Sequence, residues 1–178
     1  FNVGAPGYTL SNSNVLEFTG AGIAIAGGSL LITNDNELVF SGASSAGRAV
    51  ITNNLFLDFF DNSTAGNTVI VNESDLTFYD TSTAGNATIV NNCCLLFQGS
   101  SNAGSATITN TSSLTFADTS SAAFARITNV AFGFVSFENS STAGSAVIVN
   151  NGFVFFVDTS TAGNATITNN VLVEFEGA

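Results

Sequence analysis

The chain has 178 residues, of which 45% are hydrophobic and 8% are charged, so it is long enough for one domain and too apolar to be disordered. Its formal net charge is −11, with two Arg and neither Lys nor His. This argues against nucleic-acid binding, where basic contacts to phosphate supply most of the affinity, and against attraction to anionic lipid. No run of about 18 apolar residues occurs, so we expect no transmembrane helix.

Residues 1–19 fit the rest of the chain poorly. Leu10 and Phe18 echo later positions, but they precede Ile32 and Phe40 by a longer interval than the one that separates later equivalents. The only Pro, Pro6, lies among small residues. We interpret 1–19 as an atypical first coil or cap, since a terminal coil lacks one neighbour, and 20–178 as a repeat array. The chain contains no Met, so we expect a processed or excised piece of a longer array.

A unit of about 19 residues repeats along the array, and a fixed period of this length is typical of a solenoid. An Ala-Gly pair, or Ala-Ala once, recurs at positions 46, 65, 84, 103, 122, 143 and 162. The steps are equal except for that from 122 to 143, which is longer by two. We place the two extra residues at 130–133, as a bulge in the turn after Asn129.

Apolar residues recur in each unit with period two, which predicts short strands rather than helices. The same residue type returns at each position, as parallel strands stacking every ~4.8 Å require. We therefore predict an all-β parallel β-helix (β-solenoid), right-handed, with two or three strands per coil, about 19 residues per coil and eight to nine coils. The apolar ladders include Ile70, Ile89 and Ile108 and, in a second row, Phe59, Phe78, Phe97 and Phe116.

Three polar rows accompany these ladders. An Asn follows each Ile by two residues, at positions that include Asn53, Asn72, Asn91 and Asn110, and we expect each side-chain amide to bond the amide one coil away. A Ser row precedes each Ala-Gly pair, and we expect its hydroxyls to satisfy backbone groups at that corner. A row of Asp, Gly and Asn follows the Phe row and consists of turn formers. Within it, Asp61 and Asp80 are a weak candidate for Ca²⁺, which takes oxygen ligands, and we expect no other cofactor.

The two cysteines are adjacent, at Cys93 and Cys94. A disulfide between neighbours is strained, and two adjacent thiols do not make the spaced ligand set of a zinc site. We interpret them as two small hydrophobic residues in one loop.

Candidate chemistry is sparse. Enzymes built on β-helices need paired carboxylates in a groove, and Asp58 with Glu73 or Asp75 is the pair that the repeat brings to neighbouring coils. We interpret these as solvated outer charges and expect no enzyme. Ice binding needs a regular outward Thr array, which the pairs at 107/109 and 166/168 have. Val and Arg replace Thr in the equivalent pairs, so we interpret this row as ordinary strand surface.

A set of apolar residues alternates with the inward-facing Leu and Phe positions. If they face outward, they form an uneven apolar stripe, and large exposed apolar patches mark interfaces. Alternatively, some belong to a third, inward strand. We name this set as a candidate assembly face: Phe56, Phe60, Phe134, Phe153 and Phe155.

The block Ser-Thr-Ala-Gly-Asn-Ala-Thr-Ile-Thr-Asn-Asn at 160–170, with an x-Leu-x-Phe-x-Asp strand as at 75–80, resembles repeats of bacterial autotransporter passenger domains and related secreted β-helical adhesins. The resemblance covers about 24–178. It implies a right-handed β-helix that serves as a secreted stalk, adhesin or surface filament.

On this basis we expect a non-enzymatic structural or adhesive solenoid at the bacterial cell surface. Its expected partners are copies of itself, joined end to end or laterally into fibres, and host or surface glycans. The alternatives are a polysaccharide-binding or polysaccharide-cleaving β-helix and an ice-binding solenoid.

Overall fold

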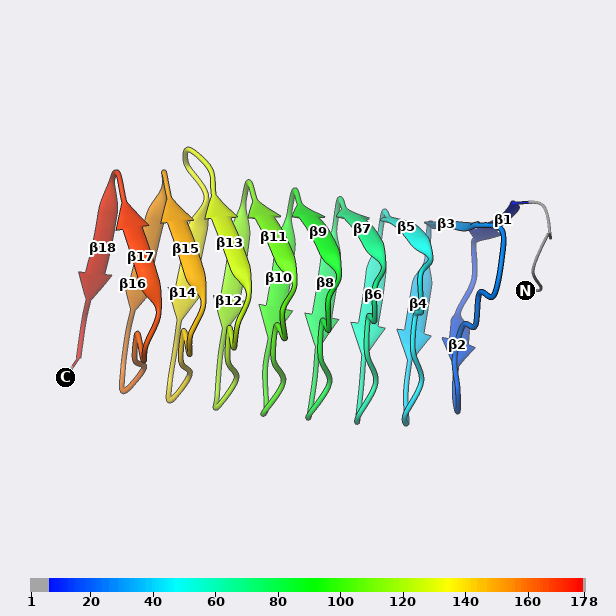
Figure 1. Cartoon of the computed structure of the whole chain (residues 1–178), viewed down its shortest axis with the longest axis horizontal. Coiled ribbons are helices and arrows are strands. Elements are labelled where there is room, and N and C mark those ends of the chain that lie inside the picture. The colour runs from blue at the N-terminus through cyan, green and yellow to red at the C-terminus, as the bar shows by residue number, and fades with distance from the viewer. Residues whose placement is uncertain (1–6, 178) are drawn as a thin grey trace.

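The computed structural model describes residues 7–177, which form a single parallel β-solenoid with no helix in this range (Figure 1). Strands alternate between two nine-stranded sheets. The odd-numbered strands form sheet A: β1 (Tyr8–Asn12), β3 (Leu30–Asn34), β5 (Val50–Asn53), β7 (Val69–Asn72), β9 (Thr88–Asn91), β11 (Thr107–Asn110), β13 (Arg126–Asn129), β15 (Val147–Asn150) and β17 (Thr166–Asn169).

The even-numbered strands form sheet B: β2 (Leu16–Phe18), β4 (Glu37–Phe40), β6 (Phe56–Phe59), β8 (Asp75–Phe78), β10 (Cys94–Phe97), β12 (Ser113–Phe116), β14 (Phe134–Phe137), β16 (Phe153–Phe156) and β18 (Leu172–Phe175). Each coil contributes one strand to each sheet. Successive coils therefore stack as parallel strands, which confirms the predicted all-β solenoid.

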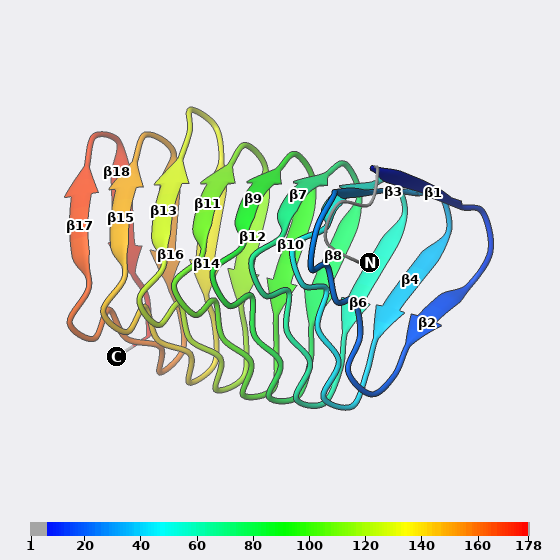
Figure 2. The same cartoon turned by 45° about the vertical axis from the view of Figure 1, so that its right-hand side comes forward.

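The coil is right-handed. In Figure 1 the odd-numbered strands rise at the front, the even-numbered strands descend behind them, and the chain advances from right to left; the turned view in Figure 2 agrees. This is the hand expected for crossovers between parallel strands.

Strand register places like residues side by side. Ile89 pairs with Ile108 and Phe78 with Phe97, so the predicted Ile and Phe ladders are confirmed. Strand partners lie one regular repeat apart except at two places, between the first two coils and across the inserted turn, where Ser113 pairs with Phe134 and Arg126 with Val147. The second exception is longer by two residues, which confirms that the insertion lies in the turn between β13 and β14.

The third side of each coil is a corner, not a third strand. It holds a single bridge position per coil, as in the pairing of Thr64 with Thr83. Residues with positive φ stand on both sides of that position, such as Asp61 (φ 57°) and Gly66 (φ 68°). Gly66 needs its missing Cβ, because an added one would lie 2.8 Å from the carbonyl oxygen of Gly47.

The core is made of rows rather than layers. Rows of Ile, Leu or Val, Phe and Ala run along the axis and are almost fully buried. The rings of the Phe row lie nearly parallel, with centroids 4.7 Å apart between Phe78 and Phe97. Identical side chains thus repeat the same packing in each coil.

The first coil is longer than the later coils. Strands β1 and β2 pair with β3 and β4 in the standard parallel manner. The three extra residues fall between Phe18 and Leu30, within the stretch that we had grouped with the array. Pro6 lies outside the described residues.

Candidate functional site

The Asn row is a continuous hydrogen-bonded chain through the interior. The Nδ2 of Asn72 donates to Oδ1 of Asn91 (2.9 Å), and Nδ2 of Asn91 donates to Oδ1 of Asn110 (2.8 Å). The same arrangement runs from Asn12 to Asn169. Nδ2 of Asn91 also donates to the carbonyl oxygen of Ser113 (2.7 Å), so each amide ties the end of one strand to the start of the next coil's strand. This confirms the predicted bond between amides one coil apart.

The Asp row bonds backbone groups of the preceding coil. Oδ2 of Asp61 accepts from the backbone N–H of Gly42 (2.9 Å), and Oδ2 of Asp80 accepts from that of Asp61 (3.0 Å). Both residues lie in the left-handed region that a turn requires. The structure therefore gives these carboxylates a turn-stabilising role. Across residues 7–177, no group of three or more His, Cys, Asp or Glu side chains is placed to hold a metal ion.

The Ser row is buried, but most of it does not bond the backbone as predicted. The hydroxyls of Ser82 and Ser120 donate to carbonyl oxygens, at 2.7 and 3.1 Å. The prediction is wrong for the others, whose buried hydroxyl oxygens have no partner: Ser44, Ser63, Ser101, Ser141 and Ser160. These buried hydroxyls do not bond one another from coil to coil, whereas the exposed hydroxyls of Ser100 and Thr119, also one coil apart, lie 2.9 Å from each other.

The predicted assembly-face residues lie on the outer surface of sheet B. Phe56, Phe134 and Phe153 begin their strands, and Phe155 is the third residue of β16, so all four alternate with buried neighbours. Phe60 follows β6 and stacks on Tyr79, with centroids 4.4 Å apart. The rings of Phe134 and Phe153 stack at 5.1 Å. These residues are outward, so they do not belong to a third inward strand.

The same surface carries a group of carboxylates. Asp58, the third residue of β6, lies between Val39 and Thr77. Burial, and then the carboxylates of Glu37 and Asp75, raise the pKa of Asp58 from 3.8 to about 6. Of the candidate catalytic carboxylates, Asp58 and Asp75 therefore share one face.

Glu73 lies apart from them, in the turn after β7. Its carboxylate accepts a hydrogen bond from Nδ2 of Asn92, at 2.9 Å. The structure thus brings together only one of the two carboxylate pairs that the repeat suggested.

The two thiols are free and 3.1 Å apart. We expected both cysteines in one loop, but Cys94 is exposed and begins β10, so that prediction is wrong. The hydrogen bond with Cys93, followed by burial, raises the pKa of the Cys94 thiol to about 11.

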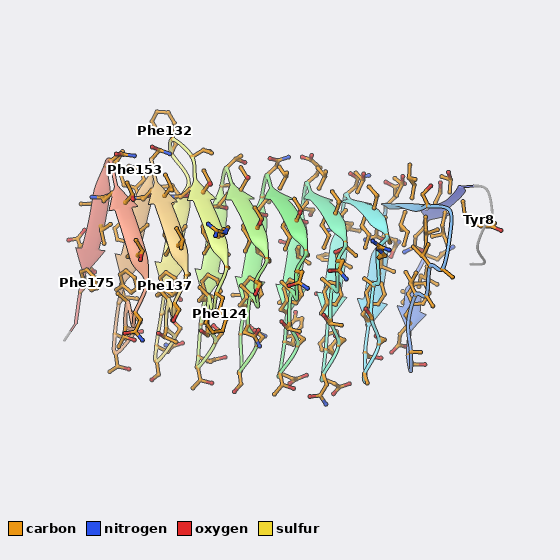
Figure 3. The ribbon with its side chains drawn as sticks, in the orientation of Figure 1. Tyr8, Phe124, Phe132, Phe137, Phe153 and Phe175 are labelled. Carbon is orange, nitrogen blue, oxygen red and sulfur yellow. The ribbon has the colours of Figure 1, made fainter. Side chains whose placement is uncertain are left out.

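The coil that contains β13 departs from the repeat at several points. From the sequence we had noted its insertion and its Ala-Ala pair, but not the conformations of these residues. Ala123 replaces Gly with φ 51°, and Phe132 in the inserted turn has φ 66°. Phe132 projects from the body at the turn after β13, and Phe124 lies before that strand (Figure 3). They are 83% and 68% exposed, the highest values among the large hydrophobic side chains described. The positive φ of Phe132 is uncommon for a bulky residue, and no sequence pattern indicated it.

The outer face of sheet A has a different character from that of sheet B. Its outward positions are the residues in each strand that flank the buried Ile. From β3 to β17 these are Leu31, Thr33, Val50, Thr52, Val69, Val71, Thr88, Val90, Thr107, Thr109, Arg126, Thr128, Val147, Val149, Thr166 and Thr168. None is a carboxylate, and Arg126 is the one charged side chain among them. The two columns contain little but Val and Thr.

No family model, curated protein or solved structure matches the chain. No helix long and apolar enough to cross a bilayer occurs among residues 7–177. The described part of the chain also contains no pocket. The features available to a function are therefore its two outer faces and its corners.

Proposed function

We propose that this chain is a non-enzymatic, extracellular structural solenoid, a rigid segment of a bacterial surface adhesin or fibre. The observation that supports this most is the unbroken interior. The Phe rings stack from Phe18 to Phe175 with centroid separations between 4.6 and 5.1 Å. A solenoid of this kind gains stability from each added coil and holds a fixed length.

The use of the polar side chains supports the same proposal. The Asn amides and the Asp row carboxylates bond the neighbouring coil, where they hold successive turns in register. These side chains therefore stabilise the rod. The resemblance to secreted β-helical adhesin repeats adds the surface location to this proposal.

Electron microscopy of the purified chain, together with a cell-attachment assay, tests the proposal. We expect short rods of constant width, and attachment of cells or beads to surfaces when the chain is displayed on them. Compact particles without rod shape, or display without any gain in attachment, would contradict it.

One observation favours a second candidate, a polysaccharide-cleaving β-helix. Asp58, with its pKa raised to about 6, lies on one face with Asp75. A carboxyl group with a raised pKa beside a second carboxylate is the arrangement that glycosidases use for a general acid and its partner. Turnover of any member of a glycan panel that is lost in Asp58→Asn would favour this enzyme over the structural role.

A further inference from the structure

The charges of this molecule are distributed unevenly around the coil. The outer face of sheet B carries Glu37, Asp58 and Asp75, and the Asp row lies at the adjoining corner. The outer face of sheet A carries no carboxylate. Strand propensity alone does not explain this, because the equivalent outward positions of sheet B accept Asp and Glu. The absence of carboxylates from sheet A is therefore a property of that face.

We propose that sheet A is the face through which two copies of this chain associate side by side. The inference rests on the proposed structural role and names the surface that assembles. With a formal net charge of −11, two copies repel each other at most approaches. The strand positions of sheet A bring no carboxylates together, and only Asp35 and Glu73 lie at its edge, in the turns after β3 and β7; like charges placed opposite each other would weaken an interface.

The side chains of sheet A suit such a contact. Outward Val50, Val69 and Val147 are 38–42% exposed, and they stand in one column with Thr88, Thr107 and Arg126. Val and Thr are β-branched and stiff, so they lose little rotamer freedom on packing. Arg126 can lay its aliphatic stem on this surface while its charged end stays at the rim.

The size of the face sets the strength of the contact. Nine strands at ~4.8 Å spacing and four residues at ~3.3 Å rise give a face of roughly 43 by 13 Å, or about 550 Å². A standard stable interface buries about 800 Å² on each partner. We therefore expect weak, reversible association of single chains, which strengthens when coils are added.

This inference differs from the assembly face that the sequence suggested. The Phe residues of sheet B are outward, but Asp58 and its neighbours lie among them. Burial first, and then repulsion from Glu37 and Asp75, raise the pKa of Asp58, so carboxylates are already close together on that face. A second copy placed on that face would add to the crowding.

Two single-cysteine proteins provide a matched test. Thr88 and Cys94 are the first residues of β9 and β10 in the same coil, both are exposed, and they lie on opposite sheets. Cys93→Ser leaves Cys94 as a reporter on sheet B. Cys93→Ser with Cys94→Ser and Thr88→Cys places the reporter on sheet A. Because β9 is the fifth of nine strands in sheet A, a two-fold axis that runs along the strands through the middle of the face brings the two Thr88 positions near each other.

Oxidised glutathione supplies the oxidant. One thiolate attacks it to give a protein–glutathione disulfide and release one glutathione, and the second protein thiolate displaces the other glutathione to form the dimer. We expect covalent dimer from the Thr88→Cys protein more than tenfold faster than from the Cys94 protein, on the order of the advantage that local concentration gives. The rate of the first step, measured in dilute protein, corrects for intrinsic thiol reactivity.

Sedimentation of two further variants checks the result without chemistry. Thr109→Asp and Thr115→Asp change the third residues of β11 and β12, again one on each sheet. Thr109→Asp should weaken association at least fivefold, on the scale of one like-charge contact, and Thr115→Asp should leave it unchanged. Circular dichroism confirms that both variants are folded.

The other outcomes are equally clear. Faster dimerisation through Cys94 would overturn the inference and assign assembly to sheet B, while the structural role would stand. No dimer from either protein, with monomers alone in sedimentation, would also overturn it. Rod shape and attachment are measured separately, so failure of the proposed function is distinguishable from failure of this inference.

Discussion

The Asn row and the Ser row are both buried and polar, both repeat once per coil, and the structure treats them differently. Each Asn amide spans the distance to the next coil and bonds its equivalent, as Asn91 does to Asn110 at 2.8 Å. The buried Ser hydroxyls do not bond their equivalents. Ser82 donates to the carbonyl oxygen of Tyr79, whereas Ser101 has no partner. Repetition alone therefore does not make a polar ladder; each side chain must also direct its donor along the axis to an acceptor in the next coil.

The difference predicts different contributions to stability. A buried group without a partner costs free energy, and a satisfied one contributes modestly but becomes costly to break. The Asn row should thus hold the array together, while the Ser row should be tolerated because the hydroxyl is small. Substitutions at Asn91, Asp58, Ser82 and Ser101 test this comparison.

Asn91→Ala should have the largest effect. It leaves Oδ1 of Asn110 and the carbonyl oxygen of Ser113 without their amide donor, removes the acceptor of Asn72 Nδ2, and opens a small cavity. We expect a loss of about 3 kcal/mol in the free energy of unfolding in urea. Asn169→Ala is the control, because that residue is exposed at the last coil and water can replace its bonds; it should lose less than about 1 kcal/mol. Equal losses at the two positions would contradict the role of the internal row.

Asn91→Ser asks whether polarity or reach matters. Serine keeps a donor and an acceptor, but its single O–H cannot replace both hydrogen bonds that Nδ2 of Asn91 donates, to Asn110 and to the carbonyl oxygen of Ser113. We expect a loss within about 1 kcal/mol of that for Asn91→Ala, measured in the same urea titrations. Near-native stability of Asn91→Ser would show that any polar group suffices.

The sequence was enough to predict the rows but not how each polar group is satisfied. Ile89 and Phe97 recur at a fixed period, so identity at each position implies stacking, and the Asn row followed from the same logic. The missing partner of the Ser101 hydroxyl was not predictable, because hydrogen bonding there depends on the side-chain rotamer and on the distance to a nearby carbonyl oxygen. Regular repetition reveals which residues are neighbours, but side-chain rotamers and atomic distances determine which of them form hydrogen bonds.

Some surface features could also be predicted from the sequence, and others could not. The insertion after Asn129 was placed correctly by counting residues, but the positive φ of Phe132 depends on how the turn closes. The raised pKa of Asp58 depends on its burial and then on Glu37 and Asp75, in the coils on either side of it. The carboxylate-free face of sheet A became visible only after each strand position had been assigned to the inside or the outside.

Asp58→Asn contrasts the outer polar groups with the uncharged inner rows. The folded-state pKa of Asp58 is raised from 3.8 to about 6, so the folded state favours the protonated form. Stability from this group is present below pH about 4 and is lost as pH rises to about 6. At pH 7 the variant should be more stable than the wild type by about 1 kcal/mol, after discounting the full shift for partial exposure.

The pH dependence distinguishes this effect from a general gain in packing. Urea unfolding of both proteins between pH 4 and 8 should show the gap closing near pH 4. Asn91→Ala serves as the reference, because the Asn row contains no titratable group and its loss should be similar across this range. A gap between Asp58→Asn and the wild type that persists at pH 4 would remove burial of charge as the cause.

Ser101→Ala and Ser82→Ala should give the smallest effects, and their difference is the sharpest test of the comparison within one row. The Ser101 hydroxyl has no partner, so its removal should leave the free energy of unfolding unchanged or raise it by up to about 0.5 kcal/mol. The Ser82 hydroxyl donates to the carbonyl oxygen of Tyr79, so its removal should cost about 1 kcal/mol. Both residues are fully buried in equivalent positions, and the cavity created is the same in each. Equal effects would mean that the Ser101 hydroxyl finds a carbonyl partner in solution. The Asn and Ser rows would then differ only in whether their side chains bond from coil to coil.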